Sequence, residues 1–191
     1  GVTTYKALKE ADAAPGKWIA IYGAGGLGNL AVQYAKKVFN AKVVAVDIND
    51  DKLALAKVSG ADIVINAKDT PNSAEKIQEL TGGCHGAVVT AVSKVAFNQA
   101  VESLRAGGTV VAVGLPSEYM ELSIVKTVLD GIKVVGSLVG TRKDLAEAFD
   151  FAAQGSVVPV VQKRPIEDAP EIFAEMEAGK INGRMVLDFT K

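Results

Sequence analysis

The chain has 191 residues, of which 49% are hydrophobic and 23% are charged. This length is enough for one sizeable α/β domain with its own core. The net charge is −1 and the charges are interspersed, which argues against a nucleic-acid partner. No apolar run is long enough to span a membrane, so we expect no membrane partner either. The single cysteine, Cys84, excludes an internal disulfide and is typical of a cytoplasmic protein.

The first two thirds of the chain alternate between short apolar runs and helical segments, after a short helix over residues 4–11 and a turn at Pro15–Gly16. The runs are almost continuously apolar, as in parallel strands covered on both faces. The expected strands are Trp18–Tyr22, Val43–Asp47, Asp62–Asn66, Ala87–Ala91, Thr109–Val113 and Lys133–Ser137. The expected crossover helices are 27–38, Asp50–Val58, Ser73–Leu80 and Val95–Leu104. This pattern predicts an α/β fold, a Rossmann-type doubly wound parallel six-stranded sheet with helices on both faces.

Three further elements are expected after the sixth strand. Thr141 is the predicted N-cap of a helix, because Asp144 follows three residues later as in a capping box. A second helix is expected around Ile172 and should end at Gly179, and the strand Arg184–Phe189 closes the chain. No internal repeat or interdomain linker is evident, so residues 1–191 are interpreted as one domain.

A glycine-rich turn of the form G-x-G-x-x-G lies between the first strand and the helix that follows it. Its glycines are Gly23, Gly25 and Gly28, and Asp47 ends the next strand nineteen residues after Gly28. Gly23 would permit the tight turn, Gly25 would let the backbone approach a pyrophosphate, and Gly28 would let helix and strand pack closely. The free amides at the helix start would then face the diphosphate. The alternative is a turn that serves only to connect strand and helix.

Asp47 is the residue that discriminates between nucleotide cofactors. A carboxylate at this position can accept both ribose hydroxyls of NAD, whereas the 2′-phosphate of NADP would meet a like charge. Ile48 and Asn49 provide no arginine for that phosphate, while Lys52 either reaches the ribose or is a solvated helix residue. We therefore predict NAD. An S-adenosylmethionine enzyme also uses a glycine turn and a ribose-binding acid, but the three-glycine spacing and the sixth strand favour the dinucleotide.

Cys84 and His85 are adjacent and resemble a metal or nucleophile pair. Neighbouring residues of an extended segment point to opposite faces, so the two side chains would seldom converge on one ion. They are also the only cysteine and histidine, too few for a zinc cage. We therefore predict neither a metal ligand nor a catalytic residue in this chain.

Several motifs together resemble the zinc-dependent medium-chain alcohol dehydrogenases, in particular the tetrameric bacterial and yeast type. In chain order they are GVTTYKAL, YGAGGLGNLAVQYAK, VVAVDINDDKLALAK, AVGLPSE, VVGSLVGTRKDL and GKINGRMVLDF. The resemblance implies that the chain is the C-terminal, NAD-binding domain of such an enzyme. It also implies that zinc is bound only in the full-length parent, by an N-terminal domain that would pack against residues 1–16 and 156–191.

The resemblance also implies a set of cofactor contacts. The nucleotide turn comprises Gly23, Gly25, Gly26, Leu27 and Gly28, with Leu27 behind the nicotinamide. The adenosine and pyrophosphate contacts are Asp47, Lys52, Ala91, Val92 and Arg184. The contacts to the nicotinamide and its carboxamide are Thr3, Val113, Leu115, Ser137 and Val139.

For function, the resemblance implies that the full-length parent interconverts small primary alcohols and aldehydes by hydride transfer, and that this fragment alone is inactive. One alternative is a zinc-free quinone or enoyl reductase of the same wider family; these usually prefer NADPH, which Asp47 opposes. Another is a stand-alone NAD-binding or sensing module. Homo-oligomers are expected, a dimer of the fragment through the edge strand Lys133–Ser137 and a tetramer of the parent.

Overall fold

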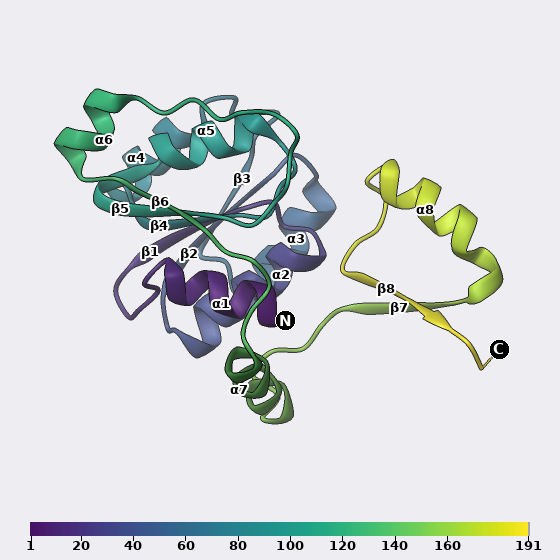
Figure 1. Ribbon diagram of the computed structural model, residues 1–191. Coiled ribbons are helices and arrows are strands. Elements are labelled where there is room, and N and C mark those ends of the chain that lie inside the picture. The colour runs from purple at the N-terminus through teal and green to yellow at the C-terminus, as the bar shows by residue number, and fades with distance from the viewer. Residues whose placement is uncertain (191) are drawn as a thin grey trace.

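The computed structural model describes residues 1–190 and is built around a six-stranded parallel sheet (Figure 1). The strands are β1 (Trp18–Tyr22), β2 (Lys42–Asp47), β3 (Ile63–Asn66), β4 (Cys84–Val89), β5 (Leu104–Ala112) and β6 (Lys133–Gly136). They lie in the order β3-β2-β1-β4-β5-β6, and all neighbours are parallel. This is the doubly wound Rossmann-type order, which confirms the predicted fold class.

Helices cover both faces of this sheet (Figure 1). They are α1 (Val2–Glu10), α2 (Gly26–Gln33), α3 (Asp50–Ser59), α4 (Ser73–Thr81), α5 (Lys94–Glu102), α6 (Ile124–Asp130) and α7 (Arg142–Ala153), and α2 continues into a π-helical turn, η1 (Tyr34–Val38). The side chains of β1 alternate between two cores, as expected for a buried strand. Ile19 and Ile21 pack in the core under α1 and α2, whereas Ala20 and Tyr22 pack in the core under α4 and α5.

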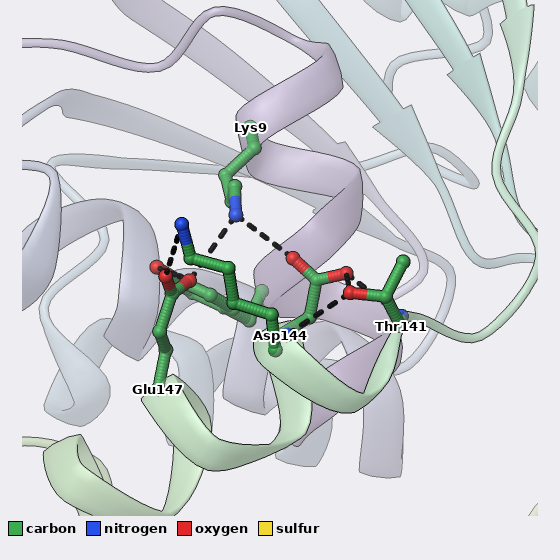
Figure 2. A network of polar contacts seen from close by, with 6 residues as sticks. Lys9, Thr141, Asp144 and Glu147 are labelled. Atoms are coloured by element: carbon green, nitrogen blue, oxygen red, sulfur yellow. Dashed lines mark hydrogen bonds and ion pairs between the residues drawn. The ribbon is translucent and has the colours of Figure 1, made fainter.

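Side-chain caps fix where several helices begin. The predicted capping box of α7 is present, because the Thr141 hydroxyl accepts from the Asp144 amide at 3.2 Å and the Asp144 carboxylate accepts from the Thr141 amide at 2.8 Å. The same carboxylate also accepts from Lys9 at 2.8 Å, and Lys9 reaches Glu147 at 3.1 Å (Figure 2). These contacts join α1 to α7, two elements far apart in the sequence.

A smaller unit lies to one side of the main sheet (Figure 1). β7 (Val161–Pro165) and β8 (Arg184–Asp188) form a separate two-stranded parallel sheet, and η2 (Ile166–Asp168) and α8 (Ala169–Glu177) connect them. The segment that leads to this unit is held by the buried side chain of Gln33. Its amide nitrogen donates to the Val158 carbonyl, and its amide oxygen accepts from the Val158 amide, both at 2.9 Å.

The structure corrects four details of the sequence-based elements. β4 is Cys84–Val89 instead of 87–91, because the amides of Thr90 and Ala91 both turn to the Tyr22 carbonyl. Leu104 lies in β5 and not in a helix, since it pairs with Cys84 in the sheet. β7 and α6 were not predicted at all. None of the helices described in residues 1–190 is both long and apolar enough to cross a membrane.

Candidate cofactor-binding site

The glycine turn lies where the strand order reverses, at the carboxyl ends of β1 and its neighbours β2 and β4. Open parallel sheets form ligand crevices at such positions. Gly23 has a φ of 95°, and a Cβ there would lie 2.8 Å from the Ala91 nitrogen. Its amide donates to the Val46 carbonyl at 2.8 Å and its carbonyl accepts from the Thr90 hydroxyl at 2.9 Å. The turn is therefore fixed between β2 and β4.

Gly25 and Gly28 serve different purposes in this turn. A Cβ at Gly28 would overlap the Gly23 carbonyl oxygen and lie 2.7 Å from the carbonyl carbon, so close packing of helix and strand requires glycine there. A Cβ at Gly25 would meet no atom of residues 1–190 within 4 Å. Gly25 is the N-cap of α2, so open space lies before the free amides of this helix.

Asp47 ends β2 and its carboxylate binds the glycine turn directly. Oδ2 accepts from the Ala24 amide at 2.7 Å, and Oδ1 accepts from the amides of Ile48 and Asn49 at 2.8 and 3.1 Å. A carboxylate offers about four acceptor positions, so these three bonds leave limited further capacity. Asp47 thus orients the turn, a structural role that the motif alone does not reveal.

A hollow of about 360 Å³ lies beside Asp47, at the carboxyl ends of β1 to β4. It brings together Gly23, Asp47, Ala91 and Val92, four residues that were expected to act together. Other lining residues were not predicted, among them Ile48, Ala67, Pro71, Val95 and Gln99. Their place in the sequence could have indicated them, because most of them follow a strand or begin the helix after it. The side chains of Ile48 and Val92 are 58% and 72% exposed, so apolar surface faces this opening.

A second hollow, of about 250 Å³, lies on the other side of the turn. Gly25, Gly26, Lys52 and Arg184 line it together, as the expected pyrophosphate and ribose contacts would require. The smaller unit supplies Arg184, and a Cβ at Gly26 would lie 2.8 Å from the Arg184 Cδ atom. Two cationic side chains therefore flank the N-terminus of α2.

The residues expected around the nicotinamide are not gathered in either hollow. They are Thr3, Leu27, Val113, Leu115, Ser137 and Val139. Thr3 lies half-buried in α1 and Leu27 half-buried in α2, whereas Val113 packs against the core under α1 and α2. Leu115 is 84% exposed and borders a different hollow, with Lys94 and Phe97.

Two of these residues are conformationally or chemically unusual. The buried Ser137 hydroxyl has no hydrogen-bond partner among residues 1–190. Val139 has a φ of 40°, a left-handed conformation that is unfavourable for a β-branched residue. Strained backbone of this kind costs about 1–3 kcal/mol and is found mostly at functional sites. Buried polar groups without a hydrogen-bond partner can also mark such sites. Both observations single out the segment after β6.

Cys84 and His85 do face different surroundings. Cys84 is fully buried in the core under α4 and α5, and this burial raises the pKa of its thiol to about 12. His85 is half-buried, and its Nδ1 accepts from the Trp18 amide at 3.1 Å. Within residues 1–190, no three side chains of His, Cys, Asp or Glu gather as metal ligands do. The Cys84 thiol is therefore neutral at physiological pH and packs as an apolar group.

The chain is similar to known proteins over its whole length. A family model described as "Zinc-binding dehydrogenase" matches residues 26–154. An alcohol dehydrogenase from the archaeon Aeropyrum pernix is 32% identical with a TM-score of 0.91, covering 98% of this chain and 55% of that one. Acetophenone reductase from Geotrichum candidum, solved in complex with NAD, is 30% identical with a TM-score of 0.86. The match covers 100% of this chain and 54% of that one.

Benzyl alcohol dehydrogenase from Acinetobacter calcoaceticus is 25% identical with a TM-score of 0.88, covering 98% of this chain and 54% of that one. The chain thus spans about half the length of these structures. The family model matches more than half of the chain, and its range begins within the glycine turn at Gly26 and includes the whole sheet from β2 to β6. The chain therefore belongs to the zinc-binding dehydrogenase family.

Proposed function

We propose that this chain binds NAD(H) and forms the cofactor-binding part of a zinc-dependent alcohol dehydrogenase that interconverts small primary alcohols and aldehydes. The observation that carries the proposal is the open space before the N-terminus of α2, next to Gly25. A helix N-terminus attracts anions, and a planar guanidinium binds phosphate well. Arg184 and Lys52 line the same hollow, so it offers the positive potential that a pyrophosphate needs.

The adenosine would occupy the larger hollow, with Asp47 near its ribose and the apolar surface of Ile48 and Val92 near its base. Similarity to a reductase solved with NAD supports this cofactor. The nicotinamide would lie toward Thr3, Leu27, Val113, Leu115, Ser137 and Val139. The Ser137 hydroxyl, which has no partner among residues 1–190, suits the carboxamide, which can both donate and accept hydrogen bonds.

Residues 1–16 and 156–191 are proposed to pack against a zinc-bearing domain of the parent enzyme. An apolar hollow of about 420 Å³ between these regions and α7 supports this arrangement. Val2, Phe149, Val161 and Val186 line it, and the Phe149 side chain is 67% exposed. The zinc would polarise the alcohol. The residues described here provide no cluster of ligands for zinc, so we expect this chain alone to be inactive.

Cofactor preference tests the proposal. NADH should bind at least about tenfold more tightly than NADPH, roughly 1.4 kcal/mol, because the Asp47 carboxylate opposes a 2′-phosphate. Asp47→Asn loses the charge and keeps one of the two acceptor oxygens that bind the Ala24, Ile48 and Asn49 amides, so it should reduce this preference. The measurement is a fluorescence titration with each nucleotide. Asp51→Asn removes an exposed acid nearby and should leave the preference intact. Equal affinity of the native chain for NADH and NADPH would refute the assignment.

We also propose that the chain forms a homodimer through β6, within a tetrameric cytoplasmic parent. Within residues 1–190, β6 pairs with β5 alone, so its other edge is open. Nearby α6 exposes its apolar side chains, which favours association. Light scattering should give about twice the chain mass of 19.9 kDa. Val134→Lys on β6 should yield a monomer, while Val58→Lys on the exposed face of α3 should not. A monomeric native chain would exclude this dimer.

A further inference from the structure

A separate hollow of about 290 Å³ lies at the amino ends of the strands, at the opposite end of the sheet from the glycine turn. Four basic side chains line it, namely Lys17 before β1, His85 in β4, Arg105 in β5 and Lys133 in β6. Glu10 and Asp12, at the end of α1, are its acidic lining residues. None of these residues belongs to the proposed cofactor site.

A bulge in β5 brings Arg105 to this place. Cys84 pairs with Leu104 and Gly86 pairs with Thr109, so residues 105–108 bulge out opposite His85. Such bulges redirect side chains at functional edges of sheets. A Cβ at Gly83 would lie 2.8 Å from the Arg105 nitrogen, so glycine at this position permits the close approach of the two strands. The backbone therefore sets the position of Arg105.

The contact between His85 and Arg105 leaves two hydrogen-bond donors facing each other. The Trp18 amide donates to Nδ1 of His85, so the hydrogen of the neutral ring is on Nε2. This Nε2 lies 3.0 Å from a guanidinium nitrogen of Arg105, which can only donate. Among residues 1–190, no oxygen accepts a hydrogen bond from the Arg105 guanidinium. An oxygen atom of a bound anion would satisfy both groups.

The charges around this contact favour an anion. Lys17 is paired with Asp12, whereas neither Arg105 nor Lys133 forms an ion pair with residues 1–190. Partial burial lowers the pKa of His85, and the positive charges of Arg105 and Lys17 lower it further. Both effects favour the neutral ring, whose one hydrogen is on Nε2 because Nδ1 accepts from the Trp18 amide. Glu10 is the acidic lining residue that forms no ion pair with residues 1–190.

We propose that this hollow binds a phosphate group, either free or as a small phosphate monoester. The phosphate oxygens would accept hydrogen bonds from His85 Nε2 and the Arg105 guanidinium, with Lys133 adding positive charge. A volume of about 290 Å³ suits a phosphate with a few attached carbon atoms and is too small for a dinucleotide. This binding is independent of the proposed cofactor, because the two sites lie at opposite ends of the sheet.

His85 is the only histidine of the chain, so its imidazole signals in an NMR spectrum are unambiguous. We would follow them while adding inorganic phosphate or glycerol phosphate at constant ionic strength, with potassium chloride as the control salt. Either phosphate should shift the signals saturably and raise the pH midpoint of His85, because a bound anion stabilises the imidazolium. Chloride should do neither, and the tighter of the two phosphates would identify the natural form.

Variants test whether the site is the one described. Arg105→Gln should weaken phosphate binding by about tenfold or more, since a charge-assisted hydrogen bond is lost. Arg142→Gln removes an exposed arginine from α7 and should change nothing. Lys133→Gln provides a second test if circular dichroism shows that Arg105→Gln misfolds. The absence of a saturable shift with both phosphates, or equal weakening by Arg105→Gln and Arg142→Gln, would overturn the proposal.

Discussion

Gly28→Ala is expected to lower the free energy of unfolding by about 3 kcal/mol, at the upper end of the usual overpacking cost. The added methyl would overlap the carbonyl oxygen of Gly23, and the neighbouring atoms are backbone. Gly23 cannot easily move away, because it is hydrogen-bonded to Val46 on β2 and to Thr90 after β4. Urea unfolding of the native and variant chains would measure the loss.

Gly25→Ala is the matched control, with the same added methyl three residues earlier. Gly25 has an ordinary φ of −66°, and its Cβ would meet no atom of residues 1–190 within 4 Å. The expected stability cost is about 1 kcal/mol, the difference between glycine and alanine as an N-cap. Its main effect should be on NADH affinity, because the methyl would enter the proposed pyrophosphate site. If both variants were equally destabilised, the close contact at Gly28 would not explain the requirement for glycine.

Asp144→Ala is expected to lower the free energy of unfolding by about 2 kcal/mol, since it removes both a helix cap and hydrogen bonds to a charged partner. Asp144 is 4% exposed, and its carboxylate accepts hydrogen bonds from Lys9 at 2.8 Å and from the Thr141 hydroxyl at 2.6 Å (Figure 2). For a chain of this size the melting temperature should fall by roughly 4–8 °C. Asp150→Ala on the exposed face of the same helix should have little effect, and an equal loss there would contradict this interpretation.

The effect of Asp144→Ala should also depend on pH. Hydrogen bonds from Lys9 and then from Thr141 hold the pKa of Asp144 well below its usual range. A carboxyl whose pKa is depressed on folding adds stability above its unfolded pKa of about 4, and this stability is lost as the pH falls toward the folded pKa. The difference between native and variant chains should therefore stay constant from pH 7 to about 5 and shrink below about pH 4. Unfolding curves across this range would check the sign.

The elements that could be predicted from the sequence are those with a local pattern. The strands of the main sheet are continuous apolar runs, and the start of α7 is marked by Thr141 and Asp144. α6 was not predicted because it is only seven residues long and none of its residues is buried, so its apolar side chains do not belong to the core that marks the other helices. β7 carries Lys163 and Arg164 and is a strand only because β8 pairs with it some twenty residues later.

The candidate site was predictable to a similar extent. The spacing of the glycines and of Asp47 indicates a nucleotide turn, and the structure places Arg184 and Lys52 beside it. The hydrogen bond from Ala24 to Asp47 could not be foreseen, because it depends on how the turn folds back on β2. The approach of Arg105 to His85 could not be foreseen either, since it depends on a bulge that no local pattern encodes.

The hydrogen bonds between Gln33 and Val158 bear on the order in which the Asp47 side and the Arg184 side of the candidate site form during folding. Asp47 reaches Ala24 across 23 residues, so that half can form as soon as the first two strands pair. The Gln33–Val158 contact joins positions 125 residues apart, and Arg184 follows later still. Contacts between distant residues form slowly, because closing a long loop costs conformational entropy before the contact can stabilise the chain. We therefore expect the Asp47 side of the candidate site to form early in folding and the Arg184 side to be completed last.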